Sequence, residues 1–187
     1  FRYSSFIEWK GPVSDQWSAQ TGIRFGQVQS DAGEVDGPGL KAPATLRNRF
    51  NGADRDKTDT LFDASLILKR PLTEAIEFHA GVSRKTRAPS YQERYAWIPI
   101  ESTAGLADGN NHVGDLSLDP EVSHEVEVGL DVTKERTYLN PRLFYRDVDD
   151  FIQGTPVDDT TAIDTPTEKV SNLNGDPSPL RFSNTGA

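Results

Sequence analysis

The chain has 187 residues, of which 35% are hydrophobic and 26% charged, and its formal net charge is −9. That length suits one ordinary domain or a piece of something larger. The negative charge argues against nucleic acid as the main partner, because neutralising phosphates requires a basic surface. The absence of cysteine excludes disulfide scaffolds, cysteine-ligated zinc and thiol catalysis.

Alternation of apolar and polar residues predicts a series of β-strands. The clearest alternation lies in residues 122–132, where valine and leucine occupy one face and glutamate, glycine and aspartate the other. A strand produces this division because successive side chains leave opposite faces of the sheet. In chain order, the expected strands cover residues 1–9, 17–27, 62–69, 76–83, 122–132 and 139–146.

The connections between these strands alternate strictly in length. The short ones are residues 10–16, 71–75 and 134–136, and the long ones are residues 33–58, 88–120 and 155–180. Long loops are unusual in a compact sandwich. An antiparallel meander with all its short turns at one end accounts for the alternation, and outer-membrane barrels have this asymmetry. We therefore expect an all-β antiparallel meander that forms part of a large transmembrane β-barrel.

Membrane-spanning helices are not expected, since the longest fully apolar runs, such as residues 66–68, are very short. This test does not address barrel strands, which are apolar on one face only. The chain starts at Phe1 without a basic segment followed by an apolar one, and it stops just after the start of an expected strand. We therefore expect residues 1–187 to be a fragment.

A soluble protein remains an alternative at this point, because a polar face opposite an apolar one also suits an antiparallel sheet with a solvated back. Such a soluble all-β binding module, for a glycan or a protein ligand, would bury Val126, Val128 and Leu130 in a sandwich core. Three long loops on one side favour the barrel. Aromatic residues near the expected strand ends suit its interfacial girdle: Trp9, Trp17, Tyr138 and Tyr145.

Two segments carry a family resemblance. Residues 87–95 read R-A-P-S-Y-Q-E-R-Y, and residues 118–130 read L-D-P-E-V-S-H-E-V-E-V-G-L. Followed in order by residues 145–152 and 184–187, they resemble the C-terminal half of the barrel of TonB-dependent outer-membrane receptors. The resemblance covers residues 17–187. It departs from the family at residues 114–118, which read G-D-L-S-L where the family often has G-N-P-x-L.

The resemblance implies a barrel of about 22 strands, filled by a plug domain, in the outer membrane of a Gram-negative bacterium. The plug, the other strands and the motif that contacts the TonB energy-coupling complex would lie outside this chain. The implied function is active uptake of a scarce solute, first of all a ferric siderophore or another metal complex. Outer-membrane lipid and lipopolysaccharide would surround the barrel.

The motif residues have plausible structural roles. Pro89 and Pro120 would end strands, because proline cannot donate to the ladder. Glu121 and Ser123 would bond backbone groups freed at that break. Gly129 would leave room on the polar face for the plug. The full set of expected structural residues is Arg87, Pro89, Glu93, Pro120, Glu121, Ser123, Glu127 and Gly129.

Candidate ligand-binding residues lie in the connection 88–120, where aromatic rings and arginine suit an anionic, ring-bearing siderophore. For each residue, packing of the loop against the barrel wall is the alternative. The candidates are Tyr91, Arg94, Tyr95, Trp97 and His112.

Catalysis is not expected, because the common hydrolase, zinc-protease and phosphate-loop motifs are missing from the sequence. A barrel enzyme would need Ser90 or Ser123 beside His124, and adjacent strand residues such as Ser123 and His124 face opposite ways. We expect no cofactor and no metal site, since the three histidines lack ligand spacing. The acidic residues of 147–168 could bind calcium, but a solvated loop accounts for them more simply.

Overall fold

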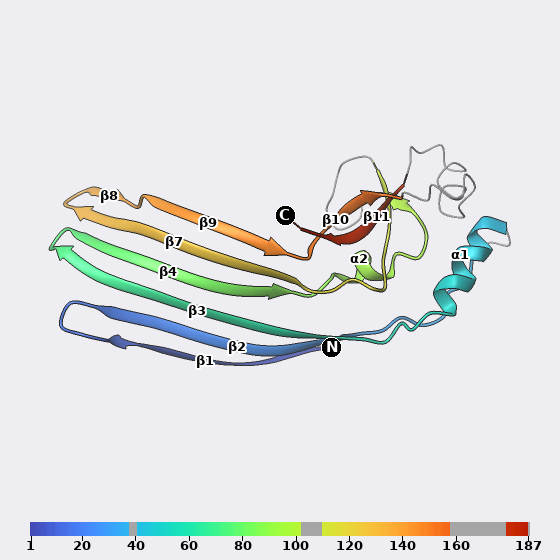
Figure 1. Cartoon of the computed structure of the whole chain (residues 1–187), viewed down its shortest axis with the longest axis horizontal. Helices are drawn as coiled ribbons and strands as arrows, with labels where there is room; N and C mark the ends of the chain where they lie inside the picture. Colours follow the sequence, from blue (N-terminus) through green and yellow to red (C-terminus); the bar gives the residue numbers. More distant parts are fainter. Residues whose placement is uncertain (38–40, 102–109, 158–178, 187) are drawn as a thin grey trace.

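The computed structural model describes residues 1–37, 41–101, 110–157 and 179–186 of the chain. Its long strands run side by side in a seven-stranded sheet (Figure 1). The strand order is β1-β2-β3-β4-β7, every neighbouring pair is antiparallel, and β8 and β9 both pair with β7. The strands are β1 (Arg2–Pro12), β2 (Ser18–Ser30), β3 (Lys57–Thr73), β4 (Ile76–Arg87), β7 (Glu121–Lys134), β8 (Thr137–Leu139) and β9 (Arg142–Asp149).

The predicted all-β antiparallel meander is confirmed. The prediction that its short turns lie at one end and its long connections at the other is also confirmed. Figure 1 shows the turns β1–β2, β3–β4 and β7–β8 at one end of the sheet and the long connections at the other. We call these the short-turn end and the long-connection end. The strand expected over residues 139–146 is interrupted at Asn140 and Pro141, because proline cannot donate to the ladder.

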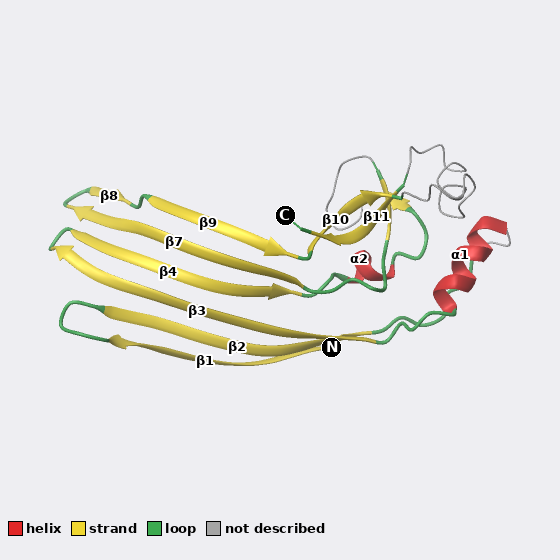
Figure 2. Cartoon of the chain, viewed as in Figure 1, coloured by secondary structure: helices red, strands yellow, loops and turns green. Residues whose placement is uncertain are grey.

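The long connections, expected to be loops, contain regular structure. A second, four-stranded sheet lies at the long-connection end in the order β10-β11-β6-β5, and its β11–β6 pair is parallel. Two helices lie at the same end (Figure 2). These elements are α1 (Lys41–Asn51), α2 (Tyr91–Tyr95), β5 (Ile100–Glu101), β6 (Asn111–Val113), β10 (Phe151–Pro156) and β11 (Leu180–Thr185). In the described ranges, no helix is long and apolar enough to cross a membrane.

Helix α1 forms because its apolar residues recur at helical spacing. Pro43 lies in the first turn, where a missing N–H costs little, and Leu46 and Phe50 are buried on one face. Arg55 covers the end of the helix: its Nη1 donates to the carbonyl of Phe50 at 3.0 Å. The guanidinium also lies 5.6 Å from the centre of the Phe50 ring. A cation at this end suits the helix dipole.

The seven-stranded sheet exposes its apolar face. Val126 is 50% exposed and Val128 is 43% exposed. The soluble-sandwich alternative, which required these valines in a core, is therefore wrong for this structure. Their neighbours across the sheet are also apolar and exposed, so the face forms a continuous apolar surface that includes Phe25, Phe62, Leu66, Val82 and Leu143.

The opposite face carries ion pairs between neighbouring strands. Lys69 on β3 contacts Glu77 on β4 at 2.9 Å, and His79 on β4 lies 3.2 Å from Glu127 on β7. Arginine takes part in others, among them Arg24 with Asp63, Arg142 with Asp131 and Arg146 with Glu125. This polar face is thus held together by side chains that satisfy one another across the strands.

A small apolar core lies at the long-connection end rather than in the large sheet. It consists of Leu118, Ile152 and Phe182, which come from the connection before β7, from β10 and from β11. The chain bends between β9 and β10 at Asp150, whose φ of 55° is unusual for a residue other than glycine. The Asn184 side chain donates to the Asp150 carbonyl at 2.7 Å and so supports this bend.

Candidate functional site

The motif at residues 87–95 folds as a strand end followed by a capped helical turn. Strand β4 ends at Arg87, two residues before Pro89. The Ser90 hydroxyl accepts from the Glu93 N–H at 3.2 Å, and the Glu93 carboxylate accepts from the Ser90 N–H at 2.6 Å. This reciprocal capping box begins α2, and the S-x-x-E spacing was its sequence signal.

Arg87 connects this turn to the second motif. Its Nε donates to Glu121 at 2.6 Å, and its Nη1 donates to Glu93 at 2.9 Å. The other carboxylate oxygen of Glu121 accepts from the Ile152 N–H at 2.8 Å. Because Glu121 is the first residue of β7, directly after Pro120, this network ties the ends of β4, β7 and β10 together.

Arg94 makes a buried ion pair that the sequence did not reveal. Its two terminal nitrogens donate to the two carboxylate oxygens of Asp59 on β3, at 2.7 and 2.9 Å. One of them also donates to the Leu118 carbonyl at 2.7 Å. Arg94 is 3% exposed. Asp59 lies in a polar stretch that gave no signal of burial, so only the tertiary fold identifies this pairing.

Tyr95 is also buried. Its hydroxyl lies 2.8 Å from the Ser30 carbonyl and 2.9 Å from the Arg55 carbonyl, and so holds the connection 31–56 against the connection 88–120. Burial raises the pKa of the Tyr95 hydroxyl above its usual value. Tyr91, in contrast, is largely exposed, with its ring centre 4.7 Å from that of Tyr95.

His112 on β6 is fully buried, with its ring stacked 5.0 Å from that of Phe182. Its Nδ1 lies 3.2 Å from the Asn110 carbonyl. Of the five candidate ligand residues, the structure therefore places Arg94, Tyr95 and His112 inside packed connections. Tyr91 and Trp97 are the two that have exposed surface.

Trp97 lines a pocket of about 280 Å³ between helix α1 and the connection 88–120. Leu46 and Phe50 of α1 form its apolar wall, and Arg49 and Arg181 bring two guanidinium groups against the single carboxylate of Asp115. These two arginines were not singled out from the sequence. Arg49 lies in a helix within the connection 33–58, which was expected to be a loop, and Arg181 lies in β11, directly after the expected connection 155–180. A pocket with rings and cations suits an anionic, partly apolar molecule.

Gly129 lies on the polar face of β7, but the space beside it is already filled. A Cβ placed there would come within 2.6 Å of the His79 ring and 2.7 Å of the Pro141 carbonyl. The room that we expected for a plug is thus occupied by this sheet's own side chains, including that of Arg142. Glu127 lies on the same face beside His79, and Ser123 pairs with Lys85 of β4.

The acidic segment 147–168 is described only in part. Asp147 and Asp149 belong to β9 and Asp150 forms the bend, whereas the acidic residues from Asp158 onward lie outside the described residues. Within the part of the chain that the structure describes, no three histidine or acidic side chains are grouped as metal ligands would be. The calcium hypothesis for this segment therefore stays a prediction.

Comparison with known proteins identifies the family. The family described as "TonB dependent receptor-like, beta-barrel" matches residues 1–187. No curated protein matches the sequence.

Solved structures share the fold at low sequence identity. A copper transporter, OprC, superposes with a TM-score of 0.65 at 15% identity, over 98% of this chain and 24% of its own. HasR of Serratia marcescens, solved with its hemophore HasA and heme, superposes with a TM-score of 0.55 at 16% identity. The match covers 83% of this chain and 26% of HasR. The siderophore receptor PirA of Pseudomonas aeruginosa superposes with a TM-score of 0.53 at 16% identity. The match covers 99% of this chain and 36% of PirA. The chain thus spans about a quarter to a third of the length of these structures.

Proposed function

Because the chain belongs to the family of TonB-dependent receptor-like β-barrels, we propose that it forms part of the wall of an outer-membrane receptor for the active uptake of a scarce solute. One observation carries this proposal. The large sheet is apolar and exposed on one face and ion-paired on the other, which is the polarity of a barrel wall with lipid outside and a polar interior.

The ion-paired face is the proposed lining of the barrel interior. In a complete receptor of about 22 strands, a plug domain would lie against it. The wall segment brings both signs of charge, so the plug would meet a surface that is already neutralised pair by pair. Energy would reach the plug from the TonB complex through a part of the protein outside residues 1–187. The barrel would stand in the outer membrane of a Gram-negative bacterium.

The proposed cargo is a metal chelate with negative charge and ring or apolar surface, such as a ferric siderophore. The pocket between α1 and the connection 88–120 supports this choice, because Trp97 and Phe50 offer rings while Arg49 and Arg181 offer cations. The structurally similar proteins are named for copper, heme and siderophores, so they favour metal-containing cargo without selecting one. Tyr91 and Trp97 are the proposed contacts within the connection 88–120.

Uptake by intact cells tests the proposal. The full-length protein that contains this chain would be expressed in a Gram-negative strain lacking its own receptors, and entry of radiolabelled ferric siderophores, heme and copper would be measured. We expect accumulation of one cargo that stops when the TonB protein is deleted or the proton gradient is collapsed. Accumulation that persists after both treatments, or none for any metal complex, would contradict the proposal.

The cargo pocket is tested in the same strain. Arg181→Gln should raise the cargo concentration that gives half-maximal uptake, because it removes a cation from the pocket. Arg136→Gln, in the short β7–β8 turn at the other end of the sheet, is the matched control and should leave uptake unchanged. Equal uptake curves for the two variants would place the cargo elsewhere.

A further inference from the structure

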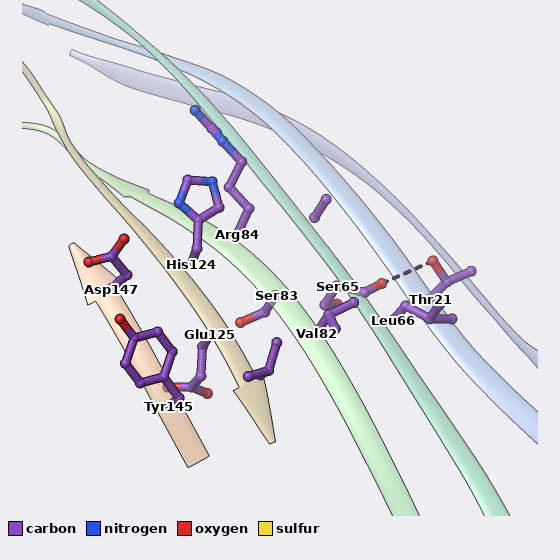
Figure 3. A pocket seen from close by; sticks show the side chains of 12 residues that line it. Thr21, Ser65, Leu66, Val82, Ser83, Arg84, His124, Glu125, Tyr145 and Asp147 are labelled. Carbon is purple, nitrogen blue, oxygen red and sulfur yellow. Dashed lines mark hydrogen bonds between the residues drawn. The ribbon is translucent and has the colours of Figure 1, made fainter. Parts of the chain in front are cut away.

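The pocket beside Trp97 differs from the hollow on the large sheet in how its walls are held. That hollow, of about 590 Å³, crosses neighbouring strands whose pairing fixes its shape (Figure 3). The pocket beside Trp97 instead lies between helix α1 and the connection 88–120, which are not paired strands. Its width therefore depends on the contacts that hold these two segments against each other.

The segment that precedes α1 is fixed to the end of this helix. The Asn51 side chain accepts from the Val35 N–H at 2.9 Å and donates to the Val35 carbonyl at 3.0 Å. The Nε of Arg55, which also covers the helix end, donates to the Ala32 carbonyl at 2.9 Å. This segment and α1 thus form one unit, and Gly37 lies only two residues after the anchored Val35.

The main chain next to Trp97 is fixed as well. The Ala96 carbonyl accepts from the Gly114 N–H at 2.7 Å, and the Glu93 carbonyl accepts from the Asp115 N–H at 3.0 Å. A Cβ at Gly114 would lie 2.8 Å from the Ala96 nitrogen, so the two stretches of backbone are in direct contact. The backbone that carries Trp97 is therefore held in place, and its ring is the part that is able to move.

Gly37 and the Trp97 ring meet between these two anchored segments. A Cβ at Gly37 would lie 2.9 Å from Cη2 of Trp97 and 3.7 Å from its Cζ2 and Cζ3, which all belong to the six-membered ring. The φ angle of Gly37 lies outside the left-handed region, so the backbone there would accept another residue. The missing side chain, rather than the backbone conformation, is what brings the ring so close.

We propose that Gly37 is a positioning residue, which leaves space for the Trp97 ring and thereby sets the width of the cargo pocket. The inference rests on the proposed function, since Trp97 is a proposed cargo contact. Gly37 does not line the pocket itself, whereas Trp97 lines it together with Leu46 and Phe50. A side chain at position 37 would displace the ring, so the space left for a ring-bearing metal complex would change.

The position of the Trp97 ring is measured without any cargo. The full-length receptor would be labelled with fluorotryptophan and studied by fluorine NMR in detergent, with the Trp97 resonance assigned by Trp97→Phe. Gly37→Val should shift that resonance, and Gly37→Ala should shift it less. Gly33→Val is the matched control, because a Cβ at Gly33, in the same connection, meets nothing within 4 Å. The Trp97 resonance of this control should stay in place.

Binding of iron(III) tris-catecholate, an anionic complex that bears rings, tests the consequence for the cargo. Gly37→Val should weaken its binding to the receptor roughly tenfold or more, the effect of a methylene-sized misfit in an apolar pocket. Gly33→Val should change the affinity less than about twofold. In the Trp97→Phe background, Gly37→Val should cause no further loss, because phenylalanine lacks the indole atoms that approach position 37.

An unmoved Trp97 resonance in Gly37→Val would overturn the inference. An equal loss of binding in the wild-type and Trp97→Phe backgrounds would also overturn it, because the loss would then not pass through the indole ring. Retained heat-modifiable mobility in electrophoresis checks that each variant is folded.

Parallel uptake assays separate this inference from the proposed function. Transport of metal complexes by a receptor whose affinity is unchanged by Gly37→Val would overturn the inference alone. A Trp97 resonance that shifts as expected in a receptor that transports nothing would overturn the uptake function and leave the positioning of the ring intact.

Discussion

At the long-connection end, single residues determine how the long connections are attached to the strands. Arg94 donates two hydrogen bonds to the Asp59 carboxylate, and both side chains are nearly inaccessible to solvent. The Tyr95 hydroxyl lies within hydrogen-bonding distance of the Ser30 and Arg55 carbonyls, at the two ends of the connection 31–56. Such buried polar groups are satisfied only in the native arrangement, so each fixes one specific packing of the connections.

Removing one member of the buried pair should be strongly destabilising. Arg94→Met leaves the Asp59 carboxylate buried without its partner, and we expect the free energy of unfolding to fall by about 3–5 kcal/mol. Urea unfolding of the full-length barrel in detergent measures this. Lys57→Met, which breaks the pair with the exposed Asp54, is the control and should cost about 0–1 kcal/mol. Similar decreases in the free energy of unfolding for both variants would show that burial does not determine the cost of breaking the ion pair.

Alkaline pH should weaken the attachment made by Tyr95. Since burial raises the pKa of this hydroxyl in the folded state, its contribution to stability is complete below the unfolded value of about 10. It is lost as the pH rises through the higher, folded value. Urea midpoints between about pH 8 and pH 12 should therefore fall less steeply for Tyr95→Phe than for the wild type. Tyr138→Phe, at an exposed tyrosine, should keep the wild-type slope.

At the scale of elements, the register of the strands in the large sheet depends on which side chains fit beside one another on each face. On the polar face, Gly129 of β7 lets the His79 ring and the Arg142 side chain approach the strand closely. Helix α2 is only five residues long and depends on its capping box. Helix α1 depends on its buried apolar stripe and on Arg55 at its end. Each element is thus completed by contacts from outside itself.

A methyl group at two glycines of the polar face should have different consequences. At Gly129 it would meet the Pro141 carbonyl at 2.7 Å, a backbone group that cannot move away easily, so Gly129→Ala should cost about 1–3 kcal/mol. At Gly22 the nearest atoms lie 3.7 Å away, so Gly22→Ala should be neutral within about 0.5 kcal/mol. Thermal unfolding of the two variants checks the difference, and equal transition temperatures would refute it.

For the whole molecule, the distribution of polarity matters more than any single contact. Val82, Val126, Val128 and Leu143 of the large sheet are exposed on one face and the ion pairs lie on the other, while the described cluster of buried apolar side chains lies at the long-connection end. In water this arrangement would expose a broad apolar surface and unpaired sheet edges. We therefore expect the isolated chain to aggregate or to require detergent.

Lipid contact of the apolar face can be tested by placing a charge on it. Val128→Arg should reduce the stability of the membrane-inserted barrel by about 2–4 kcal/mol, the cost of arginine near the bilayer midplane. Ser83→Arg puts the same side chain on the polar face of the neighbouring strand, where we expect a cost of less than about 1 kcal/mol. Folding into lipid vesicles at increasing urea concentration compares the two. A soluble protein would show no dependence on the lipid.

The strands, their antiparallel order and the family all follow from the primary structure alone. Period-two alternation is a local property, and the lengths of the connections restrict how the strands can be joined, so both are legible in the amino-acid order. The S-x-x-E spacing at Ser90 was also sufficient to predict a helix start, although residues 88–120 were expected to form a loop. Pro43, Leu46 and Phe50 likewise have a helical spacing, inside the connection 33–58 that was expected to form a loop.

The burial of polar residues and the identity of their partners, in contrast, depend on the three-dimensional fold. Asp59 and Arg94 are 35 positions apart, and Tyr95 and Ser30 are 65 apart, so their pairing follows from how the connections fold back on the sheet. The composition of each row of the apolar face depends on strand register, which brings Arg84, His124 and Asp147 into one row. Alternation assigns each residue to a face, but only the pairing of strands decides which residues become neighbours on that face.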